Sequence, residues 1–94
     1  MNHFAYEAAP RRPASASLEW KPDIERLRRE IDRSLNAGAL DHLALAEAEC
    51  WIDLIDAELV ARRNDPTDVE VHQLKLWRAE LQLLVGRARR SAST

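Results

Sequence analysis

Apolar positions recur along this chain at steps of three and four residues, the spacing of one face of an α-helix. The first such segment begins near Pro22 and ends near Gly38, because proline suits the first helical turn and Asn-Ala-Gly stops a helix. Its apolar positions are Trp20, Ile24, Leu27, Ile31 and Leu35. This single narrow stripe predicts a helix over about residues 22–37 that buries one side.

The second segment, about residues 40–63, is apolar on two roughly opposite sides. At 100° per residue, one stripe gathers Ala44, Ala48, Trp51, Ile52, Ile55 and Leu59. The other stripe gathers Leu43, Ala46, Cys50, Leu54, Ala57 and Ala61. A helix that is apolar on two sides is usually packed on two sides. One neighbour can be the first helix and the other the third, or one stripe can be left for a partner.

Residues 64–68 break that pattern and predict a third helix over about residues 67–90. Either Thr67 and Glu70 form a capping box, or Asp65 caps the helix with Pro66 in its first turn. The main apolar stripe consists of Leu74, Trp77, Leu81, Leu84, Val85 and Ala88. A minor stripe at seven-residue spacing consists of Val69, Leu76 and Leu83.

The three segments predict an all-α fold, either a small three-helix bundle or a helical hairpin plus one helix. We expect one domain over residues 17–91, since 94 residues leave room for a single core. Residues 1–16 are rich in Ala, Ser and Pro without an apolar period, which predicts a flexible tail. Only 5% of residues are aromatic and two are glycine, a composition that argues against strands and tight turns.

Charge is unevenly distributed along the chain. Residues 39–61 carry six acidic residues and no Lys or Arg, whereas seven basic residues precede this segment and seven follow it. Glu49, Asp53 and Asp56 project to one side of the second helix. They form either a solvated face balanced by arginines of the bundle or a surface that attracts a basic partner.

The sequence offers no motif for catalysis or for a cofactor. Cys50 is the only cysteine, which excludes an internal disulfide and a cysteine-based zinc cluster. Glu-x-x-His pairs, HExxH, Gly-rich phosphate loops and G-x-S-x-G are all missing. We therefore expect no catalytic residue, no metal and no cofactor. The chain has no apolar run near the roughly 20 residues of a membrane span and no secretory signal, so we expect a cytoplasmic protein.

These observations predict a non-enzymatic helical module that binds another protein with a basic or apolar surface, as an adaptor, a small chaperone or an inhibitor. The predicted binding residues are Leu43, Cys50, Leu54, Glu49, Asp53, Asp56, Val69, Leu76 and Leu83. One alternative is an acidic decoy that blocks a nucleic-acid-binding surface, as some phage-encoded anti-defence inhibitors do. Another is a structural homodimer. A net charge of −2 and an acidic middle segment argue against direct contact with nucleic acid.

Overall fold

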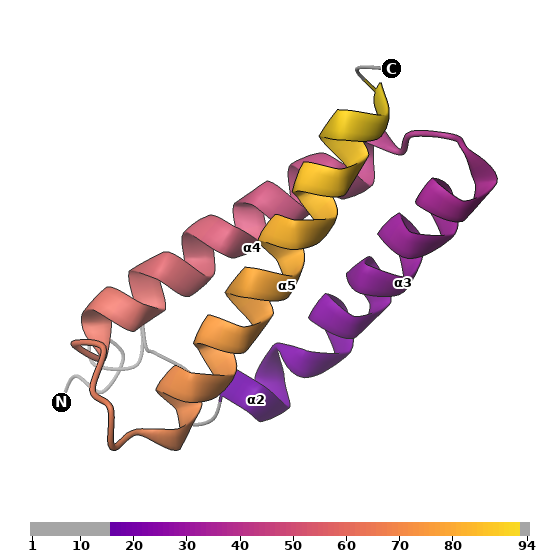
Figure 1. The fold of residues 1–94 in the computed structure, drawn as a ribbon. Helices are drawn as coiled ribbons and strands as arrows, with labels where there is room; N and C mark the ends of the chain where they lie inside the picture. Colours follow the sequence, from indigo (N-terminus) through magenta and orange to yellow (C-terminus); the bar gives the residue numbers. More distant parts are fainter. Residues whose placement is uncertain (1–15, 93–94) are drawn as a thin grey trace, which may run out of the picture.

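The computed structural model describes residues 16–92, which are helical apart from short turns (Figure 1). Three long helices pack side by side, and a single short helical turn precedes them. The elements are α2 (Ala16–Glu19), α3 (Lys21–Ala37), α4 (His42–Ala61) and α5 (Val69–Ala92). The predicted all-α bundle is confirmed for this part of the chain.

The short helix α2 is not foreseen by the sequence pattern. Ala16, which the pattern assigns to the tail, opens this helix, and α2 packs against both α3 and α5. The backbone carbonyl of Trp20 accepts a hydrogen bond from the Ile24 N–H at 3.0 Å, so α3 follows α2 directly. The rest of the predicted tail, residues 1–15, lies outside the described residues.

The turn between α3 and α4 is fixed by a glycine and an aspartate. Gly38 has a φ of 71°, the left-handed conformation that ends a helix, so the predicted stop signal is confirmed. The predicted start of the next helix near Leu40 is two residues too early. The Asp41 carboxylate accepts a hydrogen bond from the Ala44 N–H at 3.0 Å, and this N-cap places the first helical residue at His42.

The turn between α4 and α5 also differs from the prediction. Arg63 and Asn64 have φ values of 60° and 48°, and these left-handed residues end α4 at Ala61 instead of Arg63. Both predicted caps of the third helix are wrong. The Asp68 carboxylate accepts a hydrogen bond from the Glu70 N–H at 2.8 Å at the start of α5.

The core runs along the inner sides of α3, α4 and α5. Its buried apolar residues are Ile24, Leu27, Ile31, Ala44, Ala48, Ile55, Leu59, Val71, Leu74, Trp77, Leu81, Val85 and Ala88. All of them except Val71 belong to the main stripes of the sequence pattern. Trp20 and Trp51 pack edge to face beside this core, with ring centroids 5.4 Å apart. The main stripes therefore complete one core.

The two glycines offer a matched test of this backbone. Gly38→Ala places a side chain at a positive φ, and we expect it to lower the free energy of unfolding by about 1 kcal/mol. Gly86 lies within α5, where an added Cβ meets only the Arg90 Nη1 atom at 3.4 Å. Gly86→Ala should therefore raise the free energy of unfolding by about 0.5–1 kcal/mol. Urea denaturation measures the change in unfolding free energy of each variant. Equal changes in the two variants would contradict the described helix ends.

Candidate protein-binding surfaces

The second apolar stripe of α4 lies outside the core. Leu43 is 84% exposed and Leu54 is 50% exposed, and Cys50 between them is exposed as well. We call this stripe the α4 outer face: Leu43, Ala46, Cys50, Leu54, Ala57 and Ala61. All six of these side chains are exposed, so neither α3 nor α5 covers the stripe.

Sequence reasoning missed one apolar residue beside this face. Val60 is an exposed large side chain on α4. It follows Ala57 by three residues, a helical spacing that could have placed it at the edge of the α4 outer face. The exposed apolar surface of α4 is thus wider than the predicted stripe.

The minor stripe of α5 is exposed too. Leu76 is 54% exposed and Leu83 is 61% exposed, and Val69 lies outside the core at the start of the helix. We call Val69, Leu76 and Leu83 the α5 ridge. The predicted apolar binding residues of both helices therefore reach solvent, on two separate helices of the bundle.

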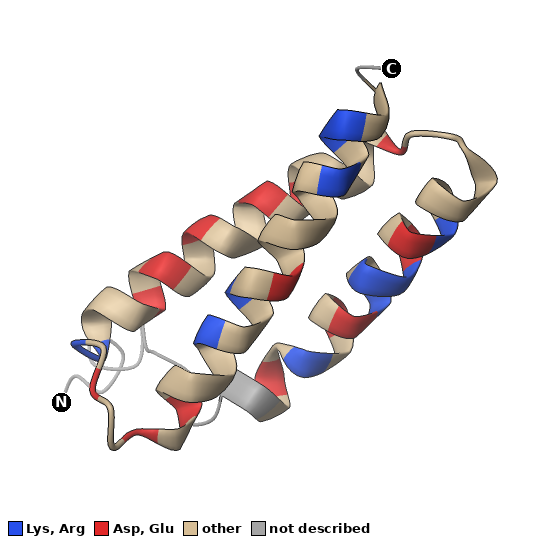
Figure 2. Cartoon of the chain, in the orientation of Figure 1, with Lys and Arg blue, Asp and Glu red and all other residues tan. Residues whose placement is uncertain are grey.

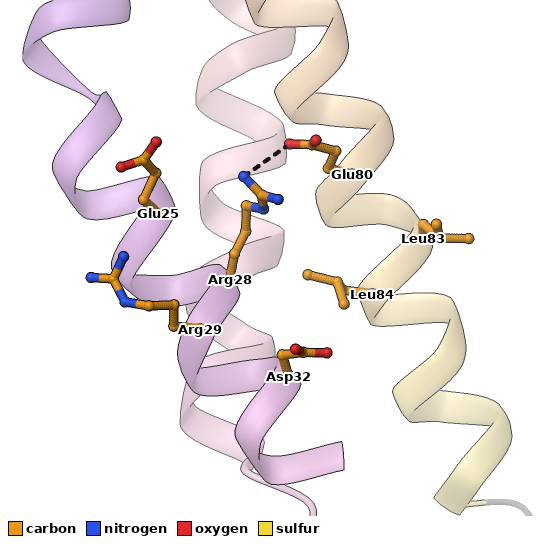
Figure 3. Close-up of a pocket in the computed structure, with 7 residues that line it drawn as sticks. All are labelled: Glu25, Arg28, Arg29, Asp32, Glu80, Leu83 and Leu84. Carbon is orange, nitrogen blue, oxygen red and sulfur yellow. Dashed lines mark ion pairs between the residues drawn. The ribbon is translucent and has the colours of Figure 1, made fainter. Parts of the chain in front are cut away.

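A groove between α3 and α5 runs beside the α5 ridge. Its larger hollow has a volume of about 600 Å³. Figure 3 shows the residues that line it, which are Glu25, Arg28, Arg29, Asp32, Glu80, Leu83 and Leu84. Arg28 bridges the groove in an ion pair with Glu80 at 3.4 Å. A second hollow of about 340 Å³ shares Arg28 and Glu80 and brings in Leu18 and Leu76. The sequence pattern gave no sign of this groove.

The three predicted acidic residues differ in their surroundings. Asp56 accepts a hydrogen bond from the Arg78 Nη1 atom at 2.8 Å, and Glu49 forms an ion pair with Arg89. Asp53 is exposed, and no Lys or Arg of the described residues pairs with it. Figure 2 shows the acidic residues along α4 and basic residues on the neighbouring helices. Two of the three acids are thus already engaged with arginines of α5.

The other side of α4 is balanced in the same way by α3. The Arg26 guanidinium donates hydrogen bonds to Glu47 at 2.7 Å and to Glu30 at 3.0 Å. The bond to Glu47, followed by that to Glu30, raises the pKa of Arg26 above its ordinary value. The Trp51 Nε1–H also donates to Glu47, at 3.4 Å. Arginines on both neighbours therefore neutralise much of the acidic helix.

One ion-pair cluster is largely buried and lies where α4 meets α5. Glu58 is only 6% exposed, and its carboxylate accepts a hydrogen bond from the Arg62 Nε–H at 2.7 Å. Arg62 also donates to Asp68 at 3.2 Å. Burial disfavours the charge of Arg62, but the hydrogen bonds to Glu58 and Asp68 outweigh it, so the pKa of Arg62 is raised. This cluster holds the α4–α5 turn and is structural.

Residues 16–92 contain no group of three or more His, Cys, Asp or Glu side chains placed to hold a metal ion. None of the helices described here is long and apolar enough to cross a membrane. Comparison with protein-family models, with curated proteins and with solved structures gives no match for this chain. The candidate surfaces therefore rest on the geometry of the chain itself.

The acidic side chains give a matched pair of charge reversals. Asp56→Lys removes the ion pair with Arg78 and places two cations together, so we expect a loss of about 1 kcal/mol in unfolding free energy at low salt. Asp53→Lys removes no ion pair that the described residues form and should leave stability within about 0.5 kcal/mol of the native chain. Thermal denaturation at low and high salt measures both. Added salt should narrow the difference, and equal losses would contradict the assigned ion pairs.

Proposed function

We propose that this protein is a non-enzymatic module that binds another protein, as an adaptor, a small chaperone or an inhibitor. The observation that carries the proposal is the α5 ridge. Leu76 and Leu83 stay half-exposed or more although the bundle has a complete core without them. Contiguous exposed apolar patches on folded proteins commonly mark interaction sites.

The groove between α3 and α5 favours a helical segment as the bound element. An amphipathic helix can lay its apolar side along a groove and use leucine-sized anchors at helical spacing. Leu76, Leu83 and Leu84 provide apolar contacts along the α5 side of this groove. Leu18, which is exposed, extends the apolar surface at the end near α2.

Charge further defines the partner helix. On the α5 side, the charged residue that lines the two hollows is Glu80, which is paired with Arg28. Across the groove, α3 presents both signs, with Glu25 and Asp32 beside Arg28 and Arg29. A partner helix with an apolar stripe toward α5 and side chains of both charges toward α3 fits this arrangement.

The same charges favour this proposal over an acidic decoy. A decoy needs carboxylates that can face the cations of a partner, whereas Glu49 and Asp56 already face Arg89 and Arg78. Of the three predicted acids, only Asp53 forms no ion pair with another described residue.

The test starts with the partner, captured on tagged protein from the native cell and identified by mass spectrometry. Binding of the purified partner is then measured by calorimetry. We expect Leu76→Glu and Leu83→Glu to weaken binding at least about tenfold, because each places a charge in an apolar contact. Leu43→Glu is the control: it makes the same change at an exposed leucine on α4 and should leave partner binding unchanged.

A triple variant with Glu49, Asp53 and Asp56 all changed to Lys separates the alternatives. Our proposal expects it to keep partner binding whenever circular dichroism shows it to be folded. Loss of binding in the folded triple variant, with full binding by Leu76→Glu, would overturn the proposal in favour of the acidic decoy.

A further inference from the structure

The α4 outer face has an unusual make-up for an exposed helix surface. Its six residues are all apolar and exposed, and each of the two leucines, Leu43 and Leu54, is followed by two small residues. Two acidic residues border it. Glu47 is paired with Arg26, and Asp53 lies in a hollow that it lines with Glu49 and Arg89. The Asp53 carboxylate can therefore stay in water while the face is covered.

The order of large and small residues makes this face complementary to itself when it is turned end for end. A two-fold axis on the outer side of α4, at the level of residue 52, places Cys50 of one chain opposite Leu54 of another, and Leu43 opposite Ala61. Each large side chain then meets a small one, which allows the two helices to interdigitate. A parallel pair would instead place Leu43 on Leu43 and Leu54 on Leu54.

From this match we propose that the α4 outer face binds the same face of a second copy in an antiparallel helix pair. This inference rests on the proposed function in one respect: both take the exposed apolar helix faces of this chain to bind protein. It assigns the α4 outer face to the second copy and leaves the α5 ridge to the other partner.

Charge supports a second copy as the occupant. Six acidic residues on and beside α4 would repel those of a second α4, but Arg26, Arg78 and Arg89 form ion pairs with three of them. Arg62 pairs with a fourth, Glu58. A strongly charged partner would find few counter-charges here, whereas a second apolar face matches the first.

The size of the face sets the expected strength. A helix of 20 residues is about 30 Å long, and two such helices alone bury less than the roughly 800 Å² per partner of a standard stable complex. We therefore expect a reversible dimer with a dissociation constant of roughly 1–100 µM.

Cysteine cross-linking in the full chain tests both the pairing and its direction. The native chain carries Cys50, and a second chain carries Cys50→Ala with Leu54→Cys and a tag of different mass. Both positions are exposed, so neither change disturbs the core. In the antiparallel pair Cys50 of the native chain lies opposite the new cysteine of the second chain. Mild oxidation of the mixture should yield the mixed disulfide in at least about fivefold excess over either self-linked product.

Each chain oxidised alone serves as the control. In the antiparallel pair, two copies of the same position are four residues apart along the helices, about 6 Å, which takes them out of disulfide geometry. A parallel pair would instead link Cys50 to Cys50 in the native chain alone, and that result would overturn the proposal.

Sedimentation supplies the second measurement. The native chain should dimerise at high micromolar concentration, and Leu54→Glu should sediment as a folded monomer. A native monomer at that concentration, or a dimer that survives Leu54→Glu, would overturn the proposal. Neither result touches the proposed function, because that rests on loss of partner binding in Leu76→Glu and Leu83→Glu.

Discussion

Three packed helices can enclose only one narrow core, and each helix can give it only one side. Among the residues that the structure describes, thirteen apolar ones fill that core, from Ile24 on α3 to Ala88 on α5. Any further apolar stripe must then lie outside. This constraint leaves the α4 outer face and the α5 ridge in solvent. Burying a leucine of these faces would release as much free energy as burying a leucine in the core. The proposed protein-binding function follows from these exposed leucines.

The polar contacts determine where these surfaces lie. Arginines of α3 and α5 flank the acidic helix α4 and form ion pairs with Glu47, Glu49 and Asp56. The buried pair of Glu58 and Arg62 fixes the turn into α5. Each exposed pair adds little stability by itself, but together they neutralise the acids that would otherwise dominate the surface. The exposed stripes that carry no charge are the α4 outer face and the α5 ridge.

Helical periodicity predicted the three long helices and nearly all of the core, because burial follows the 3.6-residue repeat. The stop at Gly38 was also predicted, since a left-handed residue there is a local property. The cap of α5 was not, because Asp65, Thr67 and Asp68 all have suitable side chains and only the folded turn selects Asp68. The groove beside Leu83 could not be predicted from the sequence either, because it depends on which sides of α3 and α5 meet.

We propose that the apolar faces, which are exposed in the single folded chain, become covered only by binding. Hydroxyl-radical footprinting of the dilute protein, read residue by residue, measures this directly. Leu43, Leu76 and Leu83 should be oxidised readily while the core residues Leu74 and Leu81 stay protected. Raising the protein concentration should protect Leu43 and Leu54 and leave Leu76 and Leu83 reactive. Protection of Leu43, Leu76 and Leu83 in the dilute single chain, or oxidation of Leu74 as fast as Leu76, would contradict this account.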